Sequence, residues 1–354
     1  MDIVVVKFGG TSVATEEARK AAVSHIASLK EAGKNVIVVV SAMGRKGSPY
    51  ATDTLISLLR KDTKPETLDL LMSCGETISA CVFADSLMAE GIDAVALASW
   101  QTAIITDGIF GSADILDIDT NRIKMELYEG KVVVITGFQG ISARKEMTTL
   151  GRGGSDTSAV VIGGLMKAES VHIFTDVPGI AVVDPRIVPK AKFMEYVDME
   201  NMYTLALWGA GIVHPRALKE AQKYNMDVFV RSTFHQGQGT RIEKNAESED
   251  GPVGIALMKE CNLFVPEKGD KLIIEGKAGK KAVRPVAGSG YSLLTVVFSG
   301  CEEEDIKNTM EDLPVKGELF INGLCAHVFV DSNEIELLAN ELYNRLFGKV
   351  PVSS

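Results

Sequence analysis

The stretch from Ile3 to Ser12 reads IVVVKFGGTS: four β-branched aliphatic residues, then a lysine, then a pair of glycines. An uninterrupted apolar run of this length is typical of a strand buried on both faces of a parallel sheet. Comparable runs occur at residues 36–40, 132–135, 171–175 and 228–230. Longer segments with helical periodicity separate them, so the sequence predicts the α/β class: a three-layer αβα sandwich with a mainly parallel sheet.

The intervening segments carry apolar residues every three or four positions, which is the period of an amphipathic helix. Helices are therefore predicted at residues 16–32, 52–59, 66–90, 156–167, 199–206 and 215–224.

A polar, acidic stretch at residues 244–252 (KNAESEDGP) has no apolar periodicity and is predicted to be a linker. It divides the chain into a domain of residues 1–245 and a domain of residues 252–354. In the second domain, strands are predicted at 253–257, 292–298, 318–321 and 326–330, with helices at 303–313 and 333–347. This order predicts a small α+β domain.

The 354 residues carry a formal net charge of −10. Without lysine- and arginine-rich runs, this acidic balance argues against nucleic acid as a partner. The uninterrupted apolar runs are shorter than a bilayer span, and the N-terminus lacks the pattern of a signal peptide, so we expect no membrane association and a cytoplasmic location. The five cysteines are widely spaced and are expected to be reduced and buried.

The first chemical motif is Lys7 with Gly9 and Gly10, directly after the first strand. Glycines allow the backbone to approach a ligand closely, and lysine supplies a compact positive charge for phosphate oxygens. The glycine pair alone is equally compatible with an ordinary turn between a strand and a helix.

The second motif, LGRGGSDTSA, begins at Leu150 and leads into an apolar helix. Ser155 and Asp156 suit a helix start, and a helix N-terminus binds anions readily. Arg152 can bind a carboxylate through two parallel hydrogen bonds.

Three further features follow strands or interrupt a helix. The segment from Thr175 to Arg186 follows a strand, and in open parallel sheets ligands lie beyond the carboxyl ends of the strands. Ser41 also follows a strand. Glu76 is a single acidic residue in an apolar helix, where a paired structural role is the commoner alternative to a binding role.

These segments, in this order, resemble the aspartate kinases of the amino-acid kinase family, and the wording of residues 41–55 is most similar to monofunctional bacterial members. The resemblance covers nearly all of residues 3–234. The matching stretches are VVVKFGGTSV, VVVVSAMGRKGSPYATDTL, SCGETIS, GFQGIS, TTLGRGGSDTSA, IFTDVPGI, DPRIVPKAK and HPRA with VFVRSTF.

The resemblance implies transfer of the ATP γ-phosphoryl group to the side-chain carboxylate of L-aspartate, the first step toward lysine, threonine and methionine. It implies catalytic roles for Lys7 and Asp156. The residues that it implies for aspartate are Ser41, Glu76, Arg152 and Ser155. Those that it implies for the nucleotide are Lys7, Gly9, Gly10, Gly154, Thr175, Asp176 and Arg186. Mg²⁺ is expected on the phosphates, and no protein ligand to it is assigned.

Two positions depart from the family pattern, because Ala181 replaces a usual tyrosine and Gly211 a usual lysine, both associated with ATP. An acceptor or nucleotide other than aspartate and ATP therefore stays open, as does a catalytically weak regulatory or amino-acid-binding role. The region after the linker resembles a shortened ACT region, either one module or a reduced pair. Such a sheet implies a homodimer.

Overall fold

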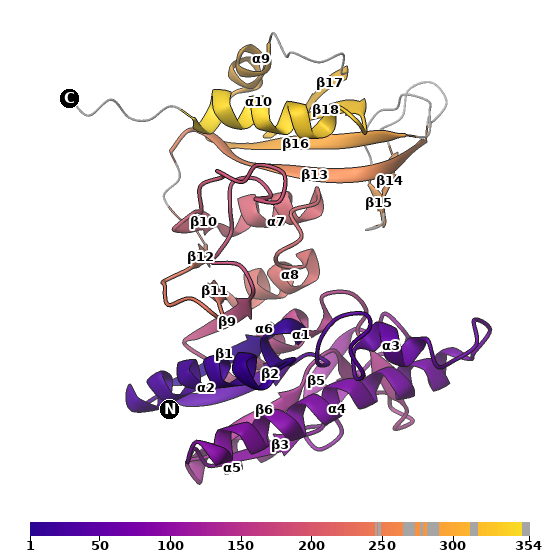
Figure 1. Ribbon diagram of the computed structural model, residues 1–354, viewed down its shortest axis with the longest axis vertical. Helices are drawn as coiled ribbons and strands as arrows, with labels where there is room; N and C mark the ends of the chain where they lie inside the picture. The colour runs from indigo at the N-terminus through magenta and orange to yellow at the C-terminus, as the bar shows by residue number, and fades with distance from the viewer. Residues whose placement is uncertain are drawn as a thin grey trace. The chain divides into compact units, whose positions relative to one another are not determined.

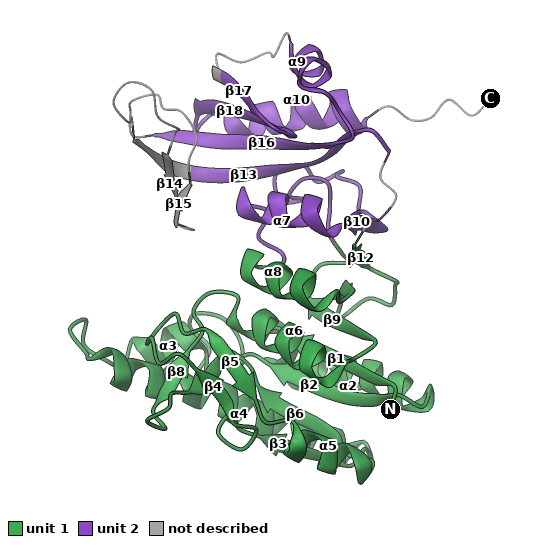
Figure 2. Cartoon of the chain, turned by 180° about the vertical axis from the view of Figure 1, so that it is seen from behind, with its two compact units in different colours: residues 1–179, 213–244 green, residues 180–212, 245–354 purple. Residues whose placement is uncertain are grey.

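The computed structural model describes residues 1–244, 246, 249–264, 273–276, 279–281, 290–311 and 318–348. The chain has two compact units (Figure 2). Unit 1 comprises residues 1–179 and 213–244, and unit 2 comprises residues 180–212 and 245–354. Residues 180–212 thus group with the C-terminal part of the chain. The division into domains of residues 1–245 and 252–354 stays a prediction.

The main sheet of unit 1 confirms the predicted parallel arrangement. Within this unit its strands run in the order β12-β11-β9-β1-β2-β6-β3, and only β12 is antiparallel to its neighbour. The bounds are β1 Ile3–Phe8, β2 Asn35–Val40, β3 Ala94–Leu97, β6 Val132–Thr136, β9 Ser170–Thr175, β11 Val228–Ser232 and β12 Thr240–Glu243. The apolar runs of the sequence form the buried centre of this sheet, because both of its faces are covered by helices.

The helices of unit 1 form the two outer layers of an αβα sandwich (Figure 1). Helices α2 and α4 pack on the face that presents Val4, Val6 and Phe8 of β1. Helix α6 packs on β1, β2 and β9, and α8 packs against α6. The bounds are α1 Gly10–Val13, α2 Glu16–Glu31, α3 Thr52–Ile56, α4 Pro65–Ala89, α5 Asn121–Tyr128, α6 Gly154–Met166 and α8 Pro215–Tyr224. The three-layer prediction is confirmed.

A second, small sheet in unit 1 has the strand order β5-β4-β7-β8. Its bounds are β4 Ile104–Thr106, β5 Ile115–Ile118, β7 Gln139–Ile141 and β8 Met147–Thr149. This sheet is not predicted from the sequence, because each strand has only three or four residues, too few to display a hydrophobic period.

Helix α4 is long and apolar enough to span a bilayer by length and composition. Half of its most apolar window is buried in the structure, and its inner face carries Phe83 and Leu87 into the core shared with β1, β2 and β6. These contacts are those of a core helix.

Unit 2 contains an antiparallel sheet in the order β15-β14-β13-β16-β18-β17. Helices α9 and α10 cover one face of it, where Leu294, Val296 and Val328 contribute to a shared core. Helix α7 packs against β13 and β16, and Trp208 at its end contacts His327 on the other face. The bounds are β10 Tyr196–Asp198, α7 Met199–Leu207, β13 Gly251–Phe264, β14 Ile273–Gly276, β15 Gly279–Lys281, β16 Tyr291–Ser299, α9 Glu303–Met310, β17 Glu318–Asn322, β18 Cys325–Asp331 and α10 Ile335–Phe347.

The expectation of buried cysteines is wrong at two positions. Cys74 and Cys81 are exposed, whereas Cys325 is buried and Cys301 is intermediate. Both exposed thiols lie on the outer face of α4, which the overall apolar composition of that helix does not reveal. All four are free thiols.

Candidate functional site

The carboxyl ends of four parallel strands meet at one edge of the main sheet of unit 1. Phe8 at the end of β1 pairs with Val40 of β2 and with Phe174 of β9, and Val40 pairs with Thr136 of β6. The chain continues from these ends through hydrogen-bonded loops: the Ser41 N–H donates to the Phe8 carbonyl at 3.1 Å. Most of the residues that the sequence predicts for the site therefore converge on this edge.

An ion pair joins Lys7 of β1 to Asp156 of α6. Lys7 Nζ lies 2.6 Å from Asp156 Oδ1, and the two side chains are only 13% and 10% exposed. Lys7 alternates with Val6 and Phe8, which face α2 and α4, so its side chain lies on the α6 side of the sheet. Burial reduces solvent screening of this pair, and a charge held there acts strongly on a ligand at the sheet edge.

The loop after β1 approaches the loop after β2 so closely that only glycine fits at position 10. A Cβ on Gly10 would lie 2.6 Å from the carbonyl oxygens of both Ala42 and Gly44. The Gly44 N–H donates to the Gly10 carbonyl at 2.9 Å, which holds the two loops together. The Gly9 N–H donates to the Phe174 carbonyl at 3.4 Å. In the described part of the chain the Gly10 N–H has no such partner, so it is available to a ligand oxygen.

The N-terminus of α6 reaches the same edge. Gly153 adopts φ 68°, and a Cβ there would lie 2.1 Å from Cβ of His214, so both backbone conformation and space require glycine. Ser155 is buried and lies against the chain at Gly137, just after β6. The Gly154 N–H donates to the Gly151 carbonyl at 3.0 Å. Arg152 is exposed in the loop that precedes the helix.

Glu76 extends from α4 into the loop after β2. The Ala42 N–H donates to Glu76 Oε1 at 3.0 Å, and the residue is 2% exposed. Burial raises the pKa of this carboxyl to about 7, while the Ala42 N–H acts in the opposite direction. Glu76 forms no ion pair with any described residue, and its hydrogen bond with the Ala42 N–H is compatible with a structural role as well as with a binding role.

Thr175 and Asp176 follow β9 at the same edge. The Thr175 hydroxyl donates to Asp176 Oδ1 at 3.2 Å, and Arg45 Nη2 lies 2.6 Å from Asp176 Oδ2. Arg45 is not among the residues predicted for the site, although it lies in the GRKG segment after β2. The remaining predicted residue, Arg186, lies in unit 2, where its exposed guanidinium pairs with Asp184.

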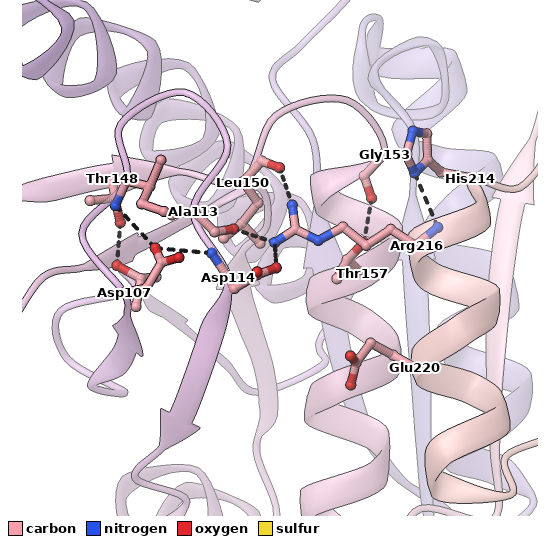
Figure 3. Close-up of polar contacts among 12 residues, drawn as sticks. Asp107, Ala113, Asp114, Thr148, Leu150, Gly153, Thr157, His214, Arg216 and Glu220 are labelled. Atoms are coloured by element: carbon pink, nitrogen blue, oxygen red, sulfur yellow. Dashed lines mark hydrogen bonds and ion pairs between the residues drawn. The ribbon is translucent and has the colours of Figure 1, made fainter. Parts of the chain in front are cut away.

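Arg216 of α8 positions the loops beside this edge, as Figure 3 shows. Its guanidinium donates to the Leu150 carbonyl at 2.5 Å, to the Ala113 carbonyl and to the Asp114 carboxylate. The motif HPRA contains Arg216, but nothing in the sequence indicates these partners. The contact with Leu150 restrains the loop that carries Arg152.

A second buried carboxylate, Asp69, secures the start of α4. Asp69 Oδ2 accepts from the Gly111 and Thr149 N–H groups at 2.9 and 2.7 Å, and Oδ1 accepts from the Thr149 hydroxyl at 3.0 Å. These bonds tie α4 to the small sheet, so Asp69 has a structural role that sequence analysis missed.

No group of three or more histidine, cysteine, aspartate or glutamate side chains arranged to hold a metal ion occurs among the described residues. The sequence assignment, which names no protein ligand to Mg²⁺, stays a prediction.

Comparison with known proteins identifies a family model for the region that contains the site. The model of the amino acid kinase family matches residues 2–232. Aspartokinase 1 of Bacillus subtilis is 42% identical over 279 residues, which are 76% of this chain and 69% of that protein. The aspartokinase of Bacillus sp. strain MGA3 is 40% identical over 265 residues, which are 73% of this chain and 63% of that protein. The chain thus spans about two thirds of the length of these relatives.

Solved structures show the same fold. The crystal structure of E. coli aspartokinase III in complex with aspartate and ADP superposes with a TM-score of 0.78, and the match covers 98% of this chain and 100% of that chain. Sequence identity in that comparison is 21%, so it bears on the fold alone.

Proposed function

The chain belongs to the amino acid kinase family, and from that membership we propose that it is an aspartate kinase. In the proposed reaction a side-chain carboxylate oxygen of L-aspartate attacks the γ-phosphorus of ATP. The bond from that phosphorus to the β–γ bridging oxygen breaks, and ADP leaves with the bond's electron pair. The products are 4-phospho-L-aspartate and ADP.

The observation that carries this proposal is the buried ion pair of Lys7 and Asp156 at the glycine-lined edge of the sheet. Phosphoryl transfer needs alignment and charge neutralisation rather than covalent assistance. Lys7 would neutralise charge on the transferring group, and Asp156 would hold the lysine in place. Gly10 would add its backbone N–H, and Gly9 and Gly154 would let the phosphates approach the backbone closely.

The remaining assignments divide between the two substrates. Arg152 would bind the α-carboxylate of aspartate and Glu76 its ammonium group, with Ser41 and Ser155 adding hydroxyl groups. For the nucleotide the proposed residues are Thr175, Asp176 and Arg186. Arg45 pairs with Asp176, so nucleotide binding at Asp176 would compete with that ion pair.

The proposal includes Mg²⁺, which would neutralise phosphate charge when bound with ATP. The described residues form no protein cage for it, so no step is assigned to a metal held by the chain. The proposal also includes a cytoplasmic location and a homodimer formed through an ACT-like C-terminal region. The antiparallel sheet of unit 2, with two helices on one face, supports that last assignment.

Hydroxylamine trapping tests the proposal directly, because acyl phosphates form hydroxamates. Purified protein would be incubated with ATP, Mg²⁺ and L-aspartate, and parallel reactions would contain L-glutamate or no amino acid. We expect hydroxamate only with aspartate. No hydroxamate from folded protein, across several nucleotides and acceptors, would contradict the kinase and favour a binding or regulatory role.

A further inference from the structure

A polar layer lies beneath Glu76, between α4 and the sheet of unit 1. Apart from Asp156 Oδ1, which Lys7 pairs, three buried side-chain oxygens in the described residues have no hydrogen-bond partner: Glu76 Oε2, Ser79 Oγ and Thr136 Oγ1. Their residues are 2%, 1% and 0% exposed. Buried hydroxyl and carboxylate oxygens are almost always hydrogen-bonded, so three exceptions in one region require an explanation.

Glu76 and Ser79 belong to the same buried stripe of α4. They are three residues apart, a spacing that places side chains next to each other on a helix. The stripe continues through Ala80 and Phe83, which lie in the core against the sheet. Glu76 and Ser79 therefore lie on the sheet-facing side of α4, near the middle of the helix.

Thr136 faces α4 from the opposite side of this layer. Val132 and Val134 of β6 pack in the core with α4, and Thr136 is the next residue on the same face of the strand. Thr136 pairs with Val40, two residues before the Ala42 N–H that binds Glu76. In the paired strands, Thr136 thus lies two positions before the loop residue that binds Glu76.

We propose that Ser79 and Thr136 are positioning residues for Glu76, and that their hydroxyl groups and Glu76 Oε2 together bind one buried water molecule. A buried water typically forms about three hydrogen bonds to polar groups that would otherwise be unsatisfied, which is the number of oxygens here. A carboxylate that accepts a bond at each oxygen is held in one orientation and in its charged form. The inference rests on the proposed function where it connects Glu76 to the substrate ammonium.

In the part of the chain that the structure describes, no charged side chain pairs with Glu76 in place of this arrangement. Elements packed against the stripe carry Arg19 on α2, Asp53 on α3 and Asp69 on α4. Arg19 donates to Ser86 and the Val13 carbonyl, and Asp69 accepts from Gly111 and Thr149. The causes that act on the pKa of Glu76 are burial and backbone N–H groups, without a charged residue among them. A hydrogen-bond donor at Oε2 would therefore favour the charged form of this carboxylate against the effect of burial.

Titration of Glu76 in the ligand-free protein tests the proposal. The free energy of unfolding would be measured from pH 4.5 to 9 for Thr136→Val and Ser79→Ala, each alone and combined with Glu76→Gln. For each variant, the free energy of unfolding with Glu76 present is compared with that of the same variant carrying Glu76→Gln. The pH dependence of this difference isolates the titration of Glu76. We expect its midpoint to rise by about one pH unit in both variants, because each loses one ligand of the water.

Two controls keep this test specific. Thr136→Ser retains the hydroxyl and should keep the native midpoint. Thr106→Val makes the same chemical change at a buried threonine whose hydroxyl bonds Thr148, so it should lower stability without moving the midpoint. An unmoved midpoint in Thr136→Val, with unchanged or increased stability, would overturn the proposal. If that variant does not fold, Ser79→Ala decides in the same way.

Steady-state kinetics of Thr136→Val provide a separate test of the link between Glu76 and aspartate binding. In Thr136→Val the KM for aspartate at pH 7 should rise several-fold with kcat changed less than about threefold, and the deficit should shrink at higher pH as Glu76 ionises. A moved midpoint without a KM effect supports the water site and counts against Glu76 as the ammonium ligand. Failure of the proposed function is thereby distinguished from failure of this inference.

Discussion

Asp156 and Glu76 are both buried carboxylates at the same edge of the sheet of unit 1, but among the described residues only Asp156 has a cation beside it. Asp156 lies on the α6 face with Lys7 Nζ at 2.6 Å, and Glu76 lies on the α4 face with a single backbone N–H on Oε1. The chain itself balances the charge on one face. On the other, the carboxylate is left with a pKa of about 7.

Under the proposed function, this difference explains how one site would bind two different ligands. A paired lysine keeps a fixed positive charge next to the glycine loop, which suits phosphate. An unpaired carboxylate becomes more stable when a cationic group arrives, which suits an ammonium group. One face of this sheet thus carries a lysine paired with a carboxylate, and the other carries a carboxylate that pairs with no cation among the described residues.

The largest expected effect comes from removing the cation of the paired face. Lys7→Ala should lower kcat by about 10³-fold or more, because preorganised charge at the transferring group is lost. Steady-state kinetics with ATP and aspartate would measure it. Lys34→Ala is the matched control, because that lysine pairs with Glu169 on the surface. Turnover near normal in folded Lys7→Ala would remove Lys7 from its proposed role.

Next in size is the pH dependence of stability that Glu76 creates. Its folded pKa of about 7 exceeds the ordinary 4.5, so the folded state binds this proton more tightly and loses stability as pH rises from 4.5 to 7. Glu76→Gln lacks this loss. Relative to the native protein it should gain up to roughly 3 kcal/mol over that interval and no more above it. Urea unfolding at several pH values would measure the gain, and a constant difference between the two proteins would contradict it.

Arg152 tests the comparison through substrate binding, because it is the residue proposed to bind the α-carboxylate of aspartate. Arg152→Ala should raise the KM for aspartate about 10- to 100-fold with a smaller effect on kcat, because a bidentate bond to the α-carboxylate is lost. Arg152→Lys keeps the positive charge without the planar guanidinium, so its KM for aspartate should lie between those of the native protein and Arg152→Ala. An unchanged KM in Arg152→Ala would contradict the carboxylate assignment.

The smallest effect is expected at the exposed ion pair of Arg45 and Asp176. Their side chains are 72% and 42% exposed, so solvent screens the pair. Arg45→Gln should change the free energy of unfolding by about 0–1 kcal/mol. Thermal unfolding at low and high salt would measure this change. A larger, salt-independent loss would show that this pair is not a simple surface pair, and the contrast with Lys7 and Asp156 would weaken.

Most elements of the parallel sheet and its helices were predictable because each is encoded within a short window. The prediction for 215–224 coincides with α8, and the prediction for 66–90 differs from α4 by one residue at each end. The hydrophobic period and the residues that start helices depend on neighbouring positions only, so they can be recognised without knowledge of the fold. The rule that ligands lie beyond strand ends then placed Lys7, Gly10 and Thr175 at one edge.

By itself, then, the sequence determined the αβα class, the order of strands and helices, and the glycine, lysine and carboxylate motifs that follow the strand ends. Only the tertiary structure decided that Lys7 faces Asp156, that Glu76 binds the Ala42 N–H, and that Arg216 restrains the loop at Leu150. The reason is physical: these contacts join residues 34 to 149 positions apart. Contacts between residues so far apart in the sequence depend on how the helices pack against the sheet. A local sequence pattern does not predict them.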